Sequence, residues 1–139
     1  MEIREYKEED EKEVIALWSL CDLVVPWNDP KKDIERKLKV DRDLFLIIKE
    51  PEMIIGTVMG GYEGHRGWIN YLTVHPQHQR KGVGTLLMKE VEKRIKSKGC
   101  PKINLQVRES NTEVLSFYKA IGYGNDNVVS LGKRLVQDS

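Results

Sequence analysis

The chain has 139 residues, enough for one domain that buries about two-thirds of the surface its unfolded form exposes. Its 23 Lys and Arg balance 22 Asp and Glu, and the formal net charge of +1 gives no reason to expect nucleic acid or an anionic membrane as a partner. Cys21 and Cys100 lack metal-ligand spacing, which favours a reducing compartment over a disulfide scaffold. No apolar run approaches the ~20 residues of a membrane span, and the charged start Met1-Glu2-Ile3-Arg4 does not resemble a signal peptide. We therefore expect a single cytoplasmic domain over 1–139.

The first part of the chain predicts a strand and two helices. Ile3 and Tyr6 indicate a short strand, and the acidic stretch 8–13 opens a helix whose apolar residues recur at helical spacing through Trp18. Asp29-Pro30 is typical of an N-cap followed by proline in the first turn, so it predicts a second helix.

A sheet follows. The β-rich runs 44–48 and 53–59, joined by the polar turn 49–52, predict an antiparallel hairpin that Gly60 and Gly61 close. The run 68–74 predicts a further strand that ends where His75-Pro76 interrupts the ladder.

The last part alternates helices and strands. Apolar residues from Thr85 onward predict the longest helix, with Gly99 at its C′ position. After a strand at 103–107, Ser110-Asn111-Thr112-Glu113 has the form of a capping box and opens a helix that ends at Gly122. Residues 128–135 predict a last strand, so the order is β-α-α-β-β-β-α-β-α-β, a mixed α/β (α+β) fold.

The segment Gln79-Arg80-Lys81-Gly82-Val83-Gly84 joins a strand to the longest helix. Glycine allows positive φ and close approach of a ligand, and the helix start adds partial positive charge, which suits a phosphate or pyrophosphate. The segment is not a Walker A loop, because Lys81 precedes Gly82, and it is not a dinucleotide fingerprint, because Leu87 stands where the third glycine belongs. Two readings remain: an anion-binding turn, or a loop that needs two glycines for its shape.

Three motifs in order carry a resemblance to a known family. They are Leu72-Thr73-Val74-His75-Pro76, then Gln79 to Leu87, then Asn111 with Phe117-Tyr118-Lys119-Ala120-Ile121-Gly122-Tyr123. Together they resemble the GNAT superfamily of acetyl-CoA-dependent N-acetyltransferases, over nearly the whole chain. The segments 21–36 and 60–67 further resemble a small bacterial subgroup, the YpeA type.

The resemblance implies a mostly antiparallel central sheet flanked by helices, with acetyl-CoA as co-substrate and no metal. It implies that the backbone of the glycine turn binds the coenzyme A pyrophosphate and that the strand before it pairs with the pantetheine arm. The residues to which it assigns cofactor binding are Leu72, Val74, Gln79, Arg80, Lys81, Gly82, Val83, Gly84, Thr85, Asn111 and Tyr118.

Acetyl transfer to an amine needs a neutral amine and a proton for the departing thiolate. Tyr118 matches the family's general acid, and tyrosine, with an ordinary pKa of about 10, can donate if it is held close. The alternative is an aromatic side chain in the core, on the stripe that Val114 and Ile121 share. Asn111 matches a residue that binds the cofactor arm, and a helix N-cap is its alternative.

The general base has no obvious candidate on the strand 68–74, which carries no acidic residue although many members of the family place a glutamate there. Glu63 or His65, in the glycine-flanked loop before that strand, is the best candidate by residue type. The alternative is that this loop is a solvated turn or a substrate rim and that solvent takes the proton.

The segment between the first two helices often covers the acceptor site in this family. Trp27 is then a wall of that site, and Asp29 or Asp33 attracts a cationic amine, although an N-cap and a solvated helix start explain the two acids equally well. His75 and His78 do not make a metal pair, because no third ligand follows nearby.

The leading hypothesis is acetyl transfer from acetyl-CoA to a primary amine, on a small molecule or on a protein N-terminus or lysine, by direct attack in a ternary complex. The missing strand glutamate motivates an alternative, a non-catalytic acyl-CoA-binding sensor, and a plain interaction domain is the third possibility. The chain is expected to be a monomer or a homodimer. Val128 and Leu135 are either a dimer edge or ordinary core residues.

Overall fold

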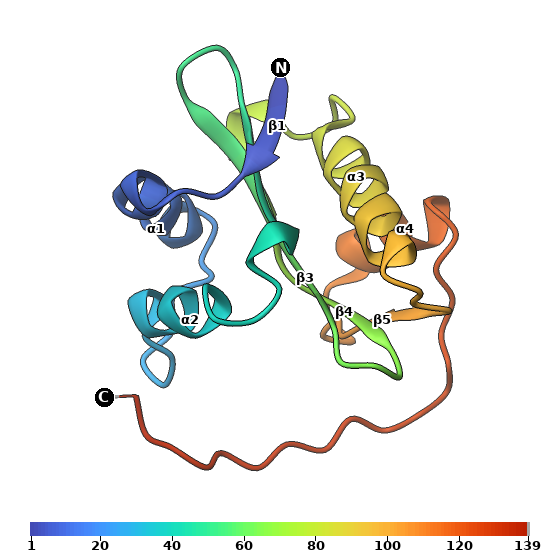
Figure 1. The fold of residues 1–139 in the computed structure, drawn as a ribbon. Helices are drawn as coiled ribbons and strands as arrows, with labels where there is room; N and C mark the ends of the chain where they lie inside the picture. Colours follow the sequence, from blue (N-terminus) through green and yellow to red (C-terminus); the bar gives the residue numbers. More distant parts are fainter. Residues whose placement is uncertain (139) are drawn as a thin grey trace.

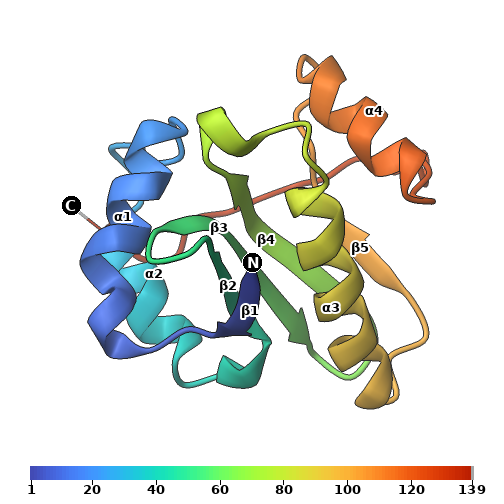
Figure 2. The same ribbon diagram turned by 90° about the horizontal axis from the view of Figure 1, so that it is seen from above.

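A five-stranded sheet separates two pairs of helices in the computed structural model, which describes residues 1–138 (Figure 1). The sheet order is β1-β2-β3-β4-β5, with antiparallel neighbours except for the parallel pair β4 and β5. Helices α1 and α2 cover one face, and α3 and α4 lie on the other (Figure 2). The elements are β1 (Glu2–Glu5), α1 (Glu11–Leu20), α2 (Pro30–Lys37), β2 (Phe45–Lys49), β3 (Ile54–Tyr62), β4 (Gly67–Val74), α3 (Val83–Ser97), β5 (Ile103–Leu105) and α4 (Thr112–Ala120).

The central strand β2 carries a continuous apolar run because both faces of the sheet are covered there. In β2, Phe45 and Ile47 pack on the α1 and α2 side, whereas Leu46 and Ile48 pack on the α3 side. All four are fully buried. The continuous apolar run 44–48 therefore serves two cores, one on each face.

Helix termini follow the local sequence. Asp29 caps α2 by accepting the Lys31 N–H at 2.9 Å, with Pro30 in the first turn, as predicted. The helix α3 ends before Gly99, which has φ of +93° in the C′ position. The predicted capping box at Ser110 is not formed, because Asn111 is the N-cap of α4 and its side chain accepts the Val114 N–H at 3.3 Å.

The sequence predicts that Gly60 closes its strand, but the structure places Gly60 inside β3. There it allows α3 to pack closely against the sheet. A Cβ at Gly60 would lie 2.6 Å from Val91 Cγ2, whereas a Cβ at Gly61, on the other face, would meet nothing nearer than 3.7 Å. The register of β3 thus places the smallest residue under the helix.

The predicted last strand at 128–135 is wrong: within residues 1–138, no strand follows α4. The segment instead runs as an elongated tail from the α4 side of the molecule to α2 (Figure 1). Its apolar side chains are exposed: Val128 has 79 % of its surface accessible and Leu135 has 85 %. Packing in the core therefore does not explain them. An apolar, β-branched run becomes a strand only where a partner completes the ladder.

Candidate functional site

The strands β4 and β5 pair only at one end. The parallel ladder joins Gly67–Ile69 to Ile103–Leu105, and beyond Ile69 no described residue pairs with β4 on that side. The pairs Thr57 with Thr73 and Met59 with Asn70 leave one residue of β3 opposite two residues of β4. This is a β-bulge, which bends a strand away from its neighbour and increases its twist. It opens the edge of β4 from Asn70 to Val74.

A chain of buried hydrogen bonds holds the bulge. Tyr71 has φ of +52°, a left-handed conformation unusual for an aromatic residue. Its carbonyl accepts the Thr57 hydroxyl at 2.8 Å and the Thr73 hydroxyl at 3.3 Å, while Thr57 Oγ1 accepts the Trp18 indole N–H at 2.9 Å. The Tyr71 ring stacks on Trp18 with centroids 3.9 Å apart. These contacts fix a conformation that would otherwise relax.

The Tyr71 side chain also connects the bulge to α2. Its hydroxyl donates to Asp33 Oδ2 at 2.7 Å, and Asp33 Oδ1 accepts from Arg36 at 3.1 Å. Burial and the Asp33 carboxylate raise the Tyr71 pKa above its ordinary value, so the hydroxyl keeps its proton. Of the two acidic residues predicted near the acceptor site, Asp29 and Asp33, it is therefore Asp33 that contacts the bulge.

The open edge of β4 presents backbone groups to the gap. The His75 N–H donates to Ile55 on β3 at 2.7 Å. Because a trans peptide points its N–H and C=O in opposite directions, the Val74 carbonyl faces away from β3. It accepts the Gln79 side-chain amide at 3.2 Å, so Gln79 closes the turn that follows. Leu72 and Val74 are half-buried and pack against the same cluster as Tyr118.

The glycine turn takes two left-handed residues, Arg80 at φ +64° and Gly82 at φ +81°, before α3 begins at Val83. No side chain caps this helix, so its first-turn N–H groups remain available to an anion. A Cβ at Gly82 would meet nothing within 4 Å, so its glycine serves the backbone conformation and leaves room for a ligand.

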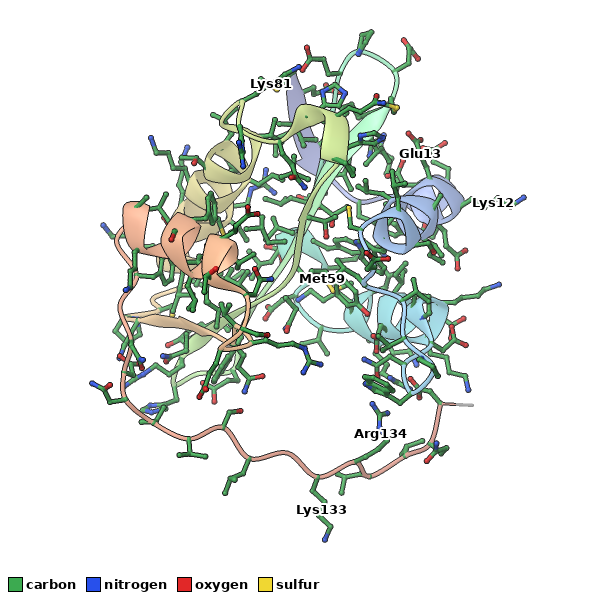
Figure 3. All side chains as sticks on the ribbon, turned by 180° about the vertical axis from the view of Figure 1, so that it is seen from behind. Lys12, Glu13, Met59, Lys81, Lys133 and Arg134 are labelled. Carbon is green, nitrogen blue, oxygen red and sulfur yellow. The ribbon has the colours of Figure 1, made fainter. Side chains whose placement is uncertain are left out.

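Gly84 has a different reason to be glycine, because a Cβ there would lie 3.2 Å from Phe117 Cζ on α4. The second proposed reading of the motif, glycine for shape, thus applies to Gly84. The exposed Arg80 side chain reaches Glu113 at 3.8 Å, and exposed Lys81 lies at the end of the molecule where α3 starts (Figure 3). Val83 is buried and Thr85 half-buried, so the turn is basic outside and apolar beneath.

Tyr118 combines a buried ring with a free hydroxyl. The side chain is 8 % exposed and makes edge contacts with Phe117 and Tyr123 at centroid distances of 5.1 and 5.5 Å. The hydroxyl has no hydrogen bond within residues 1–138, and since no buried side-chain polar atom there lacks a partner, it must reach solvent. Burial raises the Tyr118 pKa to about 12. The Tyr118 ring is thus a core residue, as the alternative interpretation predicts. Its hydroxyl stays protonated and has no partner among the described residues.

Glu63 and His65 lie in the turn between β3 and β4, at the opposite end of β4 from the glycine turn. Tyr71 lies four positions after Gly67, a distance of about 13 Å along the strand. The exposed Glu63 carboxylate accepts the backbone N–H groups of His65 and Arg66, which lower its pKa. The structure does not bring either residue to the gap.

The remaining predicted positions lie around α2 and the turn after β4. Trp27 is 48 % exposed in the loop before α2, and Asp29 is occupied as its N-cap. His75 Nδ1 accepts the Gln77 N–H at 3.1 Å, and its ring meets His78 edge-on. In the described part of the chain, no three His, Cys, Asp or Glu side chains gather as a metal site. No described helix is long and apolar enough to cross a membrane.

Sequence reasoning missed the bulge at Tyr71 and its link to Asp33. A bulge leaves no mark in the alternation of β4, and tyrosine is an ordinary strand residue. The nearest signal in the sequence is the pair of hydroxyl residues Thr57 and Thr73, which lie in neighbouring strands and are 0 % and 4 % exposed. Buried hydroxyls need partners, and here both bind the Tyr71 carbonyl.

Comparison with known proteins agrees with this geometry. The model of the acetyltransferase (GNAT) family matches residues 11–123. The chain belongs to the GNAT acetyltransferase family. Among GNAT structures, AAC(6')-Iy in complex with the bisubstrate analog CoA-S-monomethyl-acetylneamine is similar, with a TM-score of 0.77, 19 % identity and coverage of 96 % of this chain and 98 % of that one.

Two further GNAT structures show the same fold. An aminoglycoside antibiotic 6'-N-acetyltransferase from Acinetobacter haemolyticus has a TM-score of 0.73 and 17 % identity, covering 98 % of this chain and 100 % of its own. A ribosomal-protein alanine N-acetyltransferase from Escherichia coli has a TM-score of 0.74 and 18 % identity, covering 87 % and 76 %. At these identities the likeness establishes the GNAT fold and leaves the acceptor open.

Proposed function

We propose that the chain transfers an acetyl group from acetyl-CoA to a primary amine by direct attack while both substrates are bound. The observation that carries this is the uncapped start of α3, with Gly82 in the left-handed conformation, beside the opened edge of β4. Backbone N–H groups at a helix start bind a pyrophosphate, and free strand-edge groups pair with an amide-containing arm. The chain's residues fit coenzyme A in both respects.

In this proposal the backbone of residues 80–85 holds the pyrophosphate, and Leu72 and Val74 bind the pantetheine arm. The Val74 carbonyl, which accepts the Gln79 amide at 3.2 Å and the Cys21 thiol at 3.6 Å, exchanges the Gln79 amide for an N–H of the arm. The Asn111 side-chain oxygen already caps α4, so its NH₂ group and the second lone pair of that oxygen are left for the cofactor.

Tyr118 then gives its proton to the thiolate that leaves the thioester. Its raised pKa keeps the hydroxyl protonated at neutral pH, and the apolar surroundings that cause the shift disfavour a thiolate as well. Because no described residue forms a hydrogen bond with it, the hydroxyl can turn toward the sulfur.

On the acceptor side, Trp27 is a wall of the site, and Asp29 or Asp33 attracts a cationic amine. Glu63 and His65 are too far from the bulge for direct contact. Either acts on the amine only through a chain of waters, or solvent takes its proton from an amine that is already partly neutral.

The acceptor is a small molecule or a protein N-terminus or lysine. Related structures include aminoglycoside acetyltransferases and a ribosomal-protein alanine N-acetyltransferase, which supports an amine acceptor of either kind. Within the family, we propose that the chain is of the YpeA type, which the segments 21–36 and 60–67 resemble.

The test is to incubate the purified protein with acetyl-CoA and a panel of amines and peptides, follow free thiol, and identify the acetylated product by mass spectrometry. Acetylation of any amine supports the proposal. Coenzyme A binding by calorimetry, without transfer to any acceptor in a broad panel, supports the non-catalytic sensor instead, which the acid-free strand β4 favours. Failure to bind coenzyme A contradicts both.

A further inference from the structure

The side chain of Asp138 is held by several donors on and beside α2. It is 2 % exposed, although it ends an otherwise exposed tail, defined here as residues 126–138. Arg36 donates to its two carboxylate oxygens at 2.6 and 3.4 Å, and the Asp29 N–H donates at 3.2 Å. The Lys32 ammonium donates to the Asp138 backbone carbonyl at 3.3 Å. A carboxylate is therefore bound here by a two-pronged guanidinium and a backbone amide, which are groups that recognise carboxylate ligands.

These donors keep the carboxylate charged. The hydrogen bond from Arg36 is the largest cause that lowers the Asp138 pKa to about 2, and the Asp29 N–H adds to the shift. The Arg36 side chain is itself 54 % exposed, so a ligand can reach it from solvent.

The Asp138 site adjoins the acceptor side of the proposed active site. Arg36 links the two carboxylates, because it also donates to Asp33 at 3.1 Å, and Asp33 accepts the Tyr71 hydroxyl at 2.7 Å. The negative charge of Asp138 is close enough to contribute to the raised Tyr71 pKa. Tyr71 directly precedes Leu72 at the open edge of β4. One hydrogen-bonded chain thus leads from the bulge to the Asp138 carboxylate.

A cleft of about 630 Å³ lies between α2 and the tail, and the Asp138 site forms part of its lining. The lining residues include three cations, Arg36, Lys133 and Arg134, and one acid, Asp138 itself. Arg134 points toward α2 in Figure 3. The volume is in the range of small-molecule sites, and the excess of positive charge favours an anionic ligand.

Asp138 can leave this site without releasing the rest of the tail. Upstream, Asp126 accepts the Lys102 ammonium at 2.9 Å, and the Arg134 guanidinium donates to Asn28 at 2.6 Å. Both contacts lie earlier in the tail, so a movement confined to its last residues exposes the site. Asp138 is therefore an intramolecular competitor of any free carboxylate that binds there.

Opposite charges lie side by side at this site. Asp33 presents a carboxylate to an ammonium group and Arg36 presents a guanidinium to a carboxylate, and the two side chains are hydrogen-bonded to each other. In a free α-amino acid a single carbon separates the amine from the carboxylate, so both groups can meet their partners at once. An amine without a carboxylate uses only half of this arrangement.

We propose that the acceptor is an α-amino acid: its carboxylate binds Arg36 and the Asp29 N–H in place of Asp138, and its amine lies beside Asp33. The inference rests on the proposed acetyl transfer and narrows its acceptor. The ammonium group gives one proton to solvent, and its nitrogen then bonds to the acetyl carbon as the carbon–sulfur bond breaks. The nitrogen loses a second proton and the sulfur gains one, which yields an N-acetylamino acid and coenzyme A.

Binding is tested without acetyl transfer. ¹⁵N-labelled protein, with coenzyme A present, is titrated with pools of the common amino acids and with matched pools in which every carboxylate is a primary amide. Asp138→Asn removes the competing charge. In this variant we expect the amino acids to shift the Asp29 amide resonance at concentrations at least about tenfold lower than in the wild type. The amidated pools should leave that resonance in place.

Arg36 provides the second test, in the Asp138→Asn background. Arg36→Gln removes the guanidinium, and Arg42→Gln is the matched control, since Arg42 is 48 % exposed but pairs with Glu8. The preference for acid over amide, in binding and in kcat/KM for thiol release from acetyl-CoA, should fall at least about tenfold in Arg36→Gln and persist in Arg42→Gln. Because acid and amide are compared within each variant, the different basicity of their amines cancels.

Equal shifts of the Asp29 amide with acids and amides, no shift with either, or a preference that survives Arg36→Gln overturns the inference. So does stronger binding of a C-terminally amidated peptide with an N-terminal aspartate, whose carboxylate lies on the side chain, than of any free amino acid. Acid-selective binding without thiol release contradicts the proposed acetyl transfer alone, because the carboxylate site is then established by binding. Thiol release with other amines and no preference for acids supports acetyl transfer and overturns the inference.

Discussion

Replacing Tyr118 with phenylalanine should separate catalysis from folding and from cofactor binding. The hydroxyl makes no hydrogen bond within the described structure, and the buried ring keeps its contacts with Phe117 and Tyr123. The free energy of unfolding should therefore change by about 0.5 kcal/mol or less. Loss of a general acid costs at least about 10²-fold in rate, or about 2.7 kcal/mol of transition-state stabilisation.

The assay is thiol release at saturating acetyl-CoA and acceptor, with the dissociation constant for acetyl-CoA measured by calorimetry. We expect Tyr118→Phe to lower kcat about 100-fold and to leave the dissociation constant unchanged. The matched control is Tyr123→Phe, which removes a neighbouring hydroxyl that donates to Glu92 at 2.6 Å and should reduce stability without such a loss of kcat.

The pH dependence gives a second readout. Burial raises the Tyr118 pKa to about 12, so the donating form is present at every lower pH and is lost only as the pH rises through that value. The wild-type rate should show no decline attributable to Tyr118 below about pH 11, one unit under that pKa. Unchanged turnover in Tyr118→Phe would remove the residue from the mechanism, and an equal loss of folding stability and activity would make its role structural.

The other predictions concern glycines and the bulge. Gly82→Ala should cost about 1–2 kcal/mol through its left-handed φ and should also raise KM for acetyl-CoA, whereas Gly99→Ala, at φ +93° with equally open space, should show only the stability loss. A KM unchanged in Gly82→Ala would argue against the turn as the pyrophosphate site. Gly60→Ala should lower the free energy of unfolding in urea by about 1–3 kcal/mol because the new Cβ overlaps α3. Gly61→Ala, on the open face, should be nearly neutral. Equal effects of the two substitutions would contradict close packing of α3 on Gly60. Tyr71→Phe should cost about 1.5 kcal/mol for the lost bond to a carboxylate and raise KM for the acceptor more than for acetyl-CoA, and a selective rise for acetyl-CoA would contradict the placement of Asp33 on the acceptor side.

Local signals made much of the fold predictable. Asp29-Pro30 and Gly99 mark helix ends through backbone chemistry that depends on a few neighbouring residues, and both predictions are confirmed. The hairpin of β2 and β3 is confirmed as well, because two apolar runs joined by a polar turn have few other ways to bury themselves.

The predictions that failed depended on partners distant in sequence. The run 128–135 has the composition of a strand, yet a strand also needs a neighbour, and none of residues 1–138 pairs with it. Whether Ser110 or Asn111 caps α4 depends on whether the helix begins one residue earlier or later. The spacing of the apolar residues does not define a helix start to within one residue.

The candidate site was predictable where it is made of backbone and less so where it is made of side chains. The turn 79–84 and the helix after it are contiguous, so their geometry follows from the order of residues. The bulge at Tyr71 and its bond to Asp33 join segments 38 residues apart, and only the packed structure brings them together. Residue type alone points to Glu63 and His65, but the length of β4 places them at its far end.

The central claim is that the turn before α3 and the open edge of β4 together hold acetyl-CoA. Backbone amide chemical shifts, followed by NMR as acetyl-CoA is added to ¹⁵N-labelled protein, test it most directly. We expect the largest changes at the amides of residues 80–85 and at Leu72 and Val74, with small changes in the turn between β3 and β4. Saturable changes confined to other surfaces, or none at all, would contradict it.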